Sequence, residues 1–141
     1  MKGTQQNGGE FDGWFNWPDE PFEAKTAGPF FYRKDGDDYV SAFRCEEKHL
    51  NGGGVMHGGC LMTFADFSLF TIAHDHMQDS YGLTVAFASE FLDGAELGEL
   101  IEARGEVLRA GRSIIFVRGI VTANKRPCLN FSGTIKKVKP K

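Results

Sequence analysis

Residues 49–75 read HLNGGGVMHGGCLMTFADFSLFTIAHD, and from Gly58 to Ala73 this stretch is nearly all apolar or small. A helix that is apolar on every side has to be buried on every side. Asp66 is the only acidic residue of the run, and a lone carboxylate in such a helix is costly unless something pairs with it or uses it. The stretch therefore predicts a central helix, roughly residues 57–76, with a functional carboxylate inside it.

Glycines surround the predicted start of this helix. Asn51, residues 52–54, His57, Gly58 and Gly59 precede or open the apolar run. They let the backbone turn tightly and start a helix whose first N–H groups are not covered by side chains. Such a helix end can hold an oxyanion. We interpret the stretch as supplying both halves of an acyl-transfer site, an oxyanion cradle and a buried carboxylate.

The composition limits the class of protein. The chain has 141 residues, of which 41% are hydrophobic and 13% aromatic, which predicts one domain with a substantial core. A net charge of −3 gives no electrostatic reason to expect a nucleic-acid partner. The three cysteines show no CxxC spacing, the N-terminus lacks the apolar core of a signal peptide, and the apolar run is too short to span a membrane. We expect a cytoplasmic protein that binds neither nucleic acid nor membrane.

The chain divides into an N-terminal arm, residues 1–29, and a domain, residues 30–141. About the first ten residues are polar and rich in glycine, which predicts disorder. Residues 11–29 mix aromatic residues with acids and prolines, and Asp19 is placed to cap a short helix that ends near Gly28. Two interpretations of the arm remain open, a cover for apolar surface or a wall of the substrate pocket. The aromatic side chains expected to dock it are Trp14, Phe15, Trp17 and Phe22.

Strand patterns flank the central helix. Before it, two short strands are separated by Asp35-Gly36-Asp37, a hairpin signal. After it, the chain is β-rich to its end. The predicted strands are Phe30–Lys34, Asp38–Glu46, Leu83–Leu92, Glu99–Arg109, Ser113–Ala123 and Pro127–Val138. One apolar helix with one antiparallel sheet predicts an α+β fold in which the sheet curls around the helix.

This pattern resembles the hotdog-fold acyl-CoA thioesterases, specifically their phenylacetyl-CoA thioesterase-like branch. That branch shows His-x-Asn, a glycine-rich spacer, His-Gly-Gly and an Asp eight residues after the first Gly. The matching residues here are His49, Asn51, Gly54, His57-Gly58-Gly59 and Asp66. The resemblance spans roughly residues 30–138. It implies a hotdog fold, an antiparallel sheet wrapped around one long central helix, and hydrolysis of an acyl-CoA thioester to free acid and CoA.

Each motif residue has an expected role. The Gly58 backbone N–H is the candidate oxyanion donor, helped by the helix dipole. Asn51 can donate a second hydrogen bond, and the resemblance places it at the thioester carbonyl. Asp66 is the expected general base or nucleophile. The resemblance matches Thr84 to a Ser or Thr that positions the attacking water. His57 either contacts the substrate or fixes the loop before the helix.

Structural roles compete with these assignments. Asn51 could simply cap its loop, and the two glycines could serve close packing of the helix on the sheet. Asp66 could be satisfied by neighbouring backbone or by Thr63. These alternatives stay open at the level of the sequence.

Helix geometry favours a shared site. Gly58 and Asp66 are eight residues apart, about 12 Å along a helix axis. One thioester carbonyl cannot contact both within the same helix, so we expect a site across a homodimer, with further assembly into a homotetramer as a dimer of dimers. The face expected to meet the partner and the acyl group carries Gly59, Met62, Thr63, Asp66, Leu69, Phe70 and Ala73. Of these, Gly59, Met62, Thr63 and Phe70 are the candidate substrate-binding residues. The opposite face, toward the sheet, carries Leu61, Phe64, Ala65, Ser68 and Ile72.

Other chemistries fit the sequence less well. His74-Asp75-His76 lacks the spacing of a metal site, and Cys60 has no paired His, so we expect neither a metal nor a cysteine nucleophile. We expect no cofactor, because coenzyme A is part of the substrate. The competing functions are a hotdog dehydratase or hydratase and a non-enzymatic acyl-CoA binder. The acyl group stays open between aromatic and aliphatic. The basic residues considered for the CoA phosphates are Arg109, Arg112, Lys125, Arg126, Lys136, Lys137 and Lys139.

Overall fold

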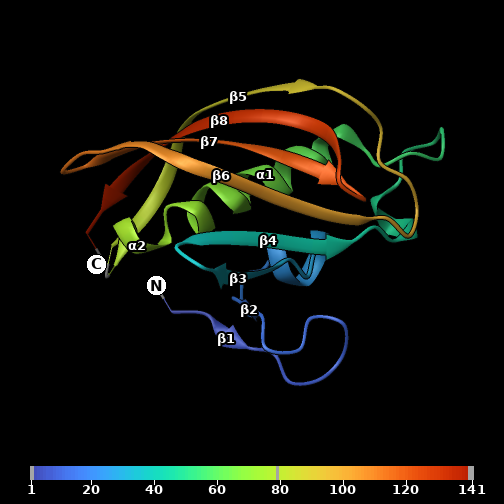
Figure 1. Cartoon of the computed structure of the whole chain (residues 1–141), viewed down its shortest axis with the longest axis horizontal. Coiled ribbons are helices and arrows are strands. Elements are labelled where there is room, and N and C mark those ends of the chain that lie inside the picture. Colours follow the sequence, from blue (N-terminus) through green and yellow to red (C-terminus); the bar gives the residue numbers. More distant parts are fainter. Residues whose placement is uncertain (1, 79, 140–141) are drawn as a thin grey trace.

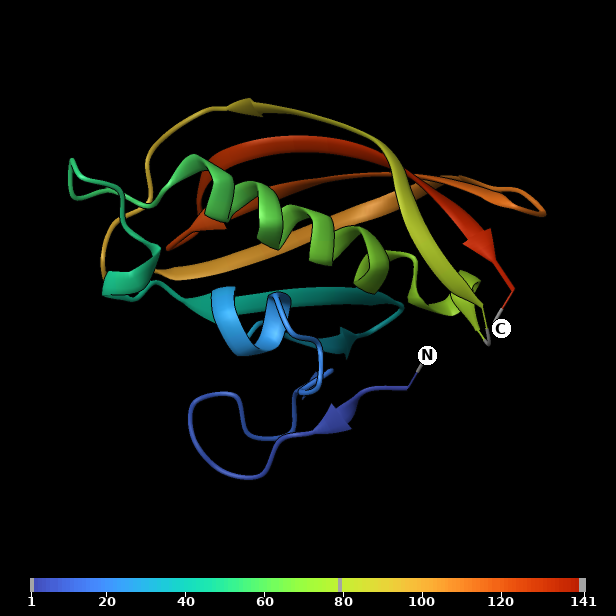
Figure 2. The same cartoon turned by 180° about the vertical axis from the view of Figure 1, so that it is seen from behind.

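An antiparallel sheet curves around one helix in the computed structural model, which describes residues 2–78 and 80–139 (Figures 1 and 2). Within those residues the sheet has eight strands in the order β1-β2-β3-β4-β6-β7-β8-β5. The strands are β1 (Thr4–Gln5), β2 (Phe15–Asn16), β3 (Phe31–Asp35), β4 (Asp38–Arg44), β5 (Tyr81–Phe91), β6 (Leu100–Ala110), β7 (Ile114–Ala123) and β8 (Arg126–Val138). The helical segments are η1 (Glu23–Ala27), η2 (Glu47–His49), α1 (Gly58–Ile72) and α2 (His74–Met77). The α+β architecture predicted from the sequence is confirmed.

The turns of the sheet follow from the sequence. In the β3–β4 hairpin, Asp35 pairs with Asp38, and Gly36 takes a φ of 66° that suits glycine at a tight turn. On β6, Ile101 and Ala103 are buried against the helix, while Arg104 and Glu106 are exposed. The predicted ends of the six main strands differ from the observed ones by no more than two residues.

The central helix is shorter and more exposed than the sequence predicts. It ends at Ile72, and after Ala73 a second short helix, α2, takes over. Met62 is 39% exposed and Gly59 is also exposed, so the helix is not buried on every side. The apolar run therefore has one open face. An open apolar face on a buried element is where a ligand or another chain can pack.

Two residues of the face predicted to be open are covered by the sheet instead. Leu69 and Ala73 were expected toward the partner and the acyl group, but both are fully buried. Leu69 packs against Gly133 of β8, at a point where any larger residue would collide with it. The prediction of these two residues is wrong because the sheet curves far enough to cover part of the second face. Phe64 packs as predicted toward the sheet, against Phe43 and Phe30.

The N-terminal arm continues the sheet. Thr4–Gln5 pairs with β2, and Phe15 of β2 pairs with Tyr32 of β3, whereas the sequence predicts disorder for residues 1–10. The expected helix is the single turn η1, which starts after Asp19 and has no side-chain cap. Trp17 stacks on Tyr32, as a docking residue should. Phe22 does not dock, since it is 58% exposed.

The end of the arm is fastened to the segment that precedes the glycine-rich loop. The buried His49 side chain hydrogen-bonds the Ala27 carbonyl oxygen through Nε2 at 2.6 Å and accepts from the Glu46 backbone N–H through Nδ1 at 2.9 Å. Lys48 donates to the Gly28 carbonyl oxygen. His49 of the sequence motif therefore acts as a connector between the arm and the loop. This places η1 alongside α1, as seen in Figure 2.

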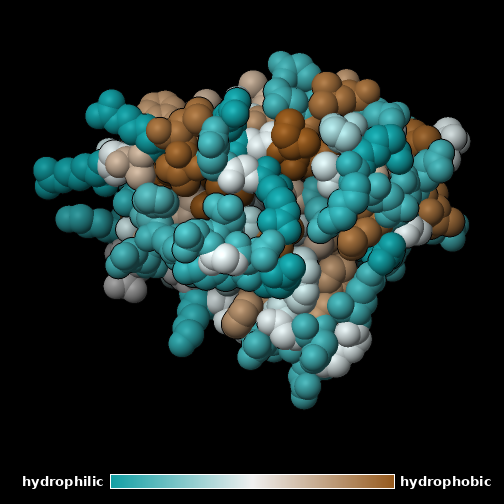
Figure 3. All heavy atoms as spheres, viewed as in Figure 1, coloured by the Kyte–Doolittle hydropathy of each residue, from teal (hydrophilic) through white to brown (hydrophobic). Residues whose placement is uncertain are grey.

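The surface is mixed. The face in Figure 3 is largely hydrophilic with separate hydrophobic patches. Strand β5 forms one end of the sheet, so its outer edge is not paired within the described residues. Leu83 and Val85 of β5 are 57% and 55% exposed, and Phe91 at its end is 54% exposed. Across the described ranges, no helix is long and apolar enough to cross a membrane.

Candidate active site

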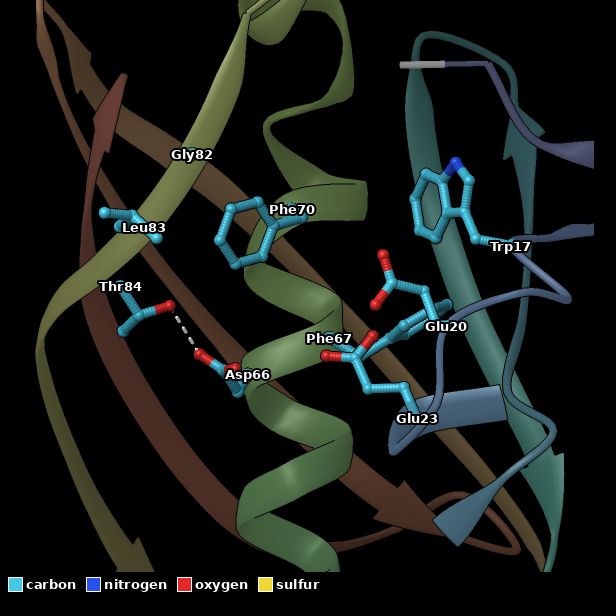
Figure 4. A pocket seen from close by; sticks show the side chains of 9 residues that line it. All are labelled: Trp17, Glu20, Glu23, Asp66, Phe67, Phe70, Gly82, Leu83 and Thr84. Carbon is cyan, nitrogen blue, oxygen red and sulfur yellow. Dashed lines mark hydrogen bonds between the residues drawn. The ribbon is translucent and has the colours of Figure 1, made fainter. Parts of the chain in front are cut away.

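A cavity of about 300 Å³ opens between α1, the edge strand β5 and the N-terminal arm (Figure 4). Its lining residues are Trp17, Glu20, Glu23, Asp66, Phe67, Phe70, Gly82, Leu83 and Thr84. The Phe70 ring projects from α1, and the Trp17 ring comes from the arm (Figure 4). An aromatic cavity with a few converging polar groups is the usual form of a small-molecule site.

Asp66 is held at this cavity by Thr84. The Thr84 hydroxyl donates a hydrogen bond of 2.6 Å to Oδ1 of Asp66, which joins the middle of α1 to β5 (Figure 4). Burial raises the pKa of the Asp66 carboxyl above its ordinary value, and the bond from Thr84 partly offsets this. Thr63 is not the partner, because its hydroxyl donates to the Gly59 carbonyl oxygen at 2.8 Å. One acceptor oxygen of Asp66 remains for a water or a substrate.

Two further carboxyl groups reach the cavity from the arm. Glu20 and Glu23 project their carboxyl groups from the side opposite β5 (Figure 4). Burial raises the pKa of Glu23 to about 7, and the negative charges of Asp66 and Glu20 act in the same direction. The arm thus both covers apolar surface and walls the cavity, so the two interpretations of this segment are compatible.

The start of α1 leaves the Gly58 backbone N–H group available as a donor. His57 caps the helix, with its Nδ1 accepting from the Gly59 N–H at 2.9 Å. The Gly58 N–H has no hydrogen-bond partner within residues 2–78 and 80–139. The Phe91 ring lies 3.1 Å from the position that a Cβ on Gly58 would occupy, so only glycine fits easily beneath it. His57 therefore fixes the loop, and Gly58 presents an N–H group at the positive end of the helix dipole.

Asn51 organises the glycine-rich loop. Its Oδ1 accepts from the backbone N–H groups of Gly53, at 2.8 Å, and Val55, at 3.3 Å. This is the loop-capping role that competed with the catalytic one. The amide nitrogen of Asn51 makes no hydrogen bond to another described residue, so it is still available as a donor.

The structure gathers some of the predicted site residues and separates others. Asp66, Thr84 and Phe70 line one cavity. Gly59, Met62 and Thr63 do not line it. Asn51, His57 and Gly58 stand at the start of α1, and Asp66 follows two helical turns later, about 12 Å along the axis. Within one chain, the Gly58 N–H group and the Asp66 carboxylate therefore do not converge.

Sequence reasoning named neither Glu20 and Glu23 nor the β5 residues Gly82 and Leu83 as site residues. The signal available in the arm was the position of Glu20 and Glu23 close to Trp17 in the sequence. For Gly82 the reason is visible in the packing. A Cβ there would come within 2.7 Å of Phe70, Met77 and Ile135, so glycine lets β5 approach the helix.

Alternative chemistries find little support in the described part of the chain. No group of three or more His, Cys, Asp or Glu residues that could hold a metal is found there. Burial raises the pKa of the Cys60 thiol to about 11, which makes it a poor nucleophile. Of the basic residues considered for the CoA phosphates, Lys125 is paired with Glu102 and Arg126 with Asp93 and Glu99.

Fold and site together define a class of protein. In this class an antiparallel sheet wraps around a central helix, and a carboxylate on that helix faces a cavity. Comparison with known families agrees, since the sequence profile of the Thioesterase superfamily matches residues 53–129, more than half of the chain. The protein belongs to this superfamily. The match covers α1, β5, β6 and β7, including Asp66 and Thr84, and leaves out the N-terminal arm.

Relatives point the same way. The Pseudomonas aeruginosa protein named "Putative esterase PA0474" is 33% identical over 108 residues, which is 75% of this chain and 81% of that protein. The Escherichia coli PaaI protein, from the phenylacetic acid degradation operon, has a TM-score of 0.71 at 18% identity, covering 80% of this chain and 82% of its own. A hypothetical thioesterase from Streptococcus pneumoniae, solved with coenzyme A, has a TM-score of 0.70 at 20% identity, covering 79% and 88%. The hotdog thioesterase fold is thus shown, and the chain is an enzyme of the thioesterase type.

Proposed function

We propose that this protein hydrolyses an acyl-CoA thioester to the free acid and CoA, with Asp66 as the reacting carboxylate. The proposal depends on one observation: the Asp66 carboxylate accepts a hydrogen bond from Thr84 and lines an aromatic cavity. Membership of the superfamily supports thioester hydrolysis in general. The structural relatives from Streptococcus pneumoniae and Streptococcus mutans were solved with coenzyme A and acetyl CoA, which supports CoA as the carrier.

The reaction follows from the groups present. Asp66 as general base takes a proton from a water whose oxygen attacks the thioester carbon. The carbonyl oxygen becomes an oxyanion, and the Gly58 N–H and the Asn51 amide stabilise it. When the C–S bond breaks, the proton returns to the departing sulfur, giving the free acid and CoA. In the alternative route, the Asp66 carboxylate attacks the carbon itself, the C–S bond breaks and the CoA thiolate leaves. Water then hydrolyses the mixed anhydride to the free acid and the Asp66 carboxylate, and the proton released in this step neutralises the thiolate. Neither route requires a cofactor.

The site is completed by a second copy of the chain. Because Gly58 and Asp66 of one helix are about 12 Å apart, one carbonyl can contact only the Gly58 of one chain and the Asp66 of another. Two features support such a dimer. The outer edge of β5 is unpaired within the described residues, and Leu83 and Val85 of this strand are exposed. A homodimer would hold two such sites, and a dimer of dimers four.

The activity itself is tested with a panel of acyl-CoAs. We expect release of free CoA thiol from at least one of the short, medium, long or aromatic acyl-CoAs, and no loss of rate in the presence of a chelator. Binding of acyl-CoAs without turnover of any of them would favour a non-enzymatic acyl-CoA binder. Loss of rate in chelator that zinc restores would contradict a metal-free mechanism.

The shared site is tested by mixing two inactive variants. Asn51→Asp keeps the oxygen that caps the loop and removes the amide donor, while Asp66→Asn removes the reacting carboxylate. In a mixed dimer one site collects both changes, and the other has an intact Asn51 from one chain and an intact Asp66 from its partner. Random pairing makes about half of the dimers mixed, so activity should return to about a quarter of wild type by two-fold symmetry. No recovery in verified mixed dimers would contradict the shared site.

A further inference from the structure

The cavity beside Asp66 contains a concentration of like charge. Three of its lining residues carry carboxyl groups, Asp66 from α1 and Glu20 and Glu23 from the arm. The other six lining residues are neutral, and none of the nine is Lys, Arg or His. The surface that this chain offers to an entering acyl group is therefore aromatic and negatively charged.

Glu23 faces this cavity without a partner that would neutralise it. Within the described residues its carboxyl group makes no hydrogen bond or ion pair, and the charges that act on it are those of Asp66 and Glu20. Glu20 faces it from its own arm and Asp66 from α1, while β5 presents only the neutral Thr84 and apolar surface (Figure 4). Because the side chain is half-buried, water screens its charge less than at an open surface.

We propose that Glu23 is a specificity-determining residue, which makes the cavity reject acyl groups ending in a carboxylate and restricts the substrate to uncharged acyl chains. This inference rests on the proposed function, since it places the acyl group in the cavity beside Asp66. A terminal carboxylate on the acyl chain would be a further negative charge in a partly desolvated space. Such a charge costs binding energy unless a cation pairs with it.

The arm is the part of the cavity that can set specificity independently of the chemistry. It lies outside the superfamily match, whereas Asp66 and Thr84 lie within it. The η1 turn is anchored on both sides. Before it, the Trp17 ring stacks on Tyr32, and at its end the Ala27 carbonyl oxygen is hydrogen-bonded to His49. Removing the Glu23 charge should therefore alter which acyl groups fit while leaving the reacting carboxylate in place.

The test compares two acyl-CoAs of equal chain length, hexanoyl-CoA and adipoyl-CoA, which differ in a terminal carboxylate. In the wild-type enzyme we expect kcat/KM for adipoyl-CoA to be at least about a hundredfold lower. Glu23→Gln keeps the shape of the side chain and should reduce this ratio by roughly tenfold, the scale of a single like-charge contact of moderate screening. Asp19→Asn is the matched control, because it removes the same charge from an exposed position of the same arm that does not line the cavity. It should leave the ratio unchanged.

The pH dependence sharpens the test. The terminal carboxylate of the adipoyl group is ionised throughout pH 6–8, whereas Glu23 loses its proton near pH 7. In the wild type, discrimination against adipoyl-CoA should grow as the pH rises through this window. In Glu23→Gln the growth should be markedly smaller.

Binding provides a readout that does not need turnover. The hexyl and ω-carboxypentyl thioethers of coenzyme A should show the same preference in their dissociation constants, even if no acyl-CoA were hydrolysed. Failure of the proposed function would appear as absence of thiol release from every acyl-CoA. Failure of the present inference would appear as equal binding of the two thioethers to the wild type, or as a preference that Glu23→Gln does not change.

Discussion

The two walls of the cavity hold their carboxyl groups in different ways. Asp66 sits inside a regular helix and receives a hydrogen bond of 2.6 Å from Thr84 on a long strand. Glu23 sits on a five-residue turn of the arm and receives no such hydrogen bond from the part of the chain that the structure describes. Burial raises the pKa of both, but only for Asp66 does a hydrogen bond pull it back. The difference teaches that the rigid wall positions a carboxylate for reaction, while the arm adds charge that shapes what can enter.

The largest effect on activity should come from a substitution of Asp66 on α1. Asp66→Asn removes the reacting carboxylate, and kcat should fall by at least about a hundredfold, the usual scale for loss of an acid–base group. KM should change little, because the substrate is held mainly elsewhere. Steady-state kinetics with the best acyl-CoA measure both, and thermal unfolding checks the fold, which should survive because Asn is isosteric and uncharged. Near-full kcat would make Asp66 structural and the mechanism wrong.

A smaller effect on activity should follow when Asp66 is kept and the hydroxyl of Thr84, which donates to it, is removed. Thr84→Val removes the hydrogen bond that stabilises the Asp66 carboxylate, so kcat should fall roughly tenfold, in line with losing a hydrogen bond to a charged group. The pKa of Asp66 should rise, because burial is then unopposed. Activity that needs the carboxylate rises with pH, so the acidic limb of the pH–rate profile should move to higher pH. Thr84→Ser restores the donor and should return the profile, and an unmoved limb in Thr84→Val would contradict the role of this bond.

The smallest effect concerns the stability of the arm wall. The pKa of Glu23 lies near 7 in the folded protein against an ordinary 4.5, so between these values the folded state holds a proton that the unfolded state has lost. Stability of the wild type should therefore decrease as the pH rises from about 4.5 to 7, and the loss is complete above this window. Glu23→Gln should be more stable than wild type by about 1 kcal/mol at pH 8, a figure reduced for solvent screening of a half-exposed group.

Denaturant unfolding of the two proteins at pH 4 and pH 8 measures this difference, with Asp19→Asn as the exposed control on the same arm. At pH 4 the variant and the wild type should be nearly equal, because Glu23 is then largely protonated in both states. A variant that is equally stabilised at both pH values would show that packing, and not charge, is responsible.

The motif residues show how far a sequence can be interpreted without coordinates. The spacing of Gly58 and Asp66 on one helix follows from helix geometry, so their separation could be predicted, and the hairpin at Gly36 follows from turn chemistry. The family resemblance singled out Thr84 only as a residue that positions the attacking water. Its hydrogen bond to Asp66 was not predicted, because the two residues are eighteen positions apart on different elements. The role of His57 stayed open because a side chain that caps a helix and one that meets a substrate look alike in sequence.

Local rules were enough for much of this protein. The apolar run and the glycines before it predicted the central helix and singled out Asp66. The alternating strand patterns predicted the sheet around the helix. Periodicity and turn preference act over a few residues, so both can be recognised in the sequence. Only the tertiary structure decided that Leu69 and Ala73 are covered by the sheet, that Phe22 is exposed, and that Glu20 and Glu23 face Asp66. Those outcomes depend on how strongly the sheet curves and on where the arm is fastened by Trp17 and His49. Both are long-range packing effects, which the order of residues along the chain does not express.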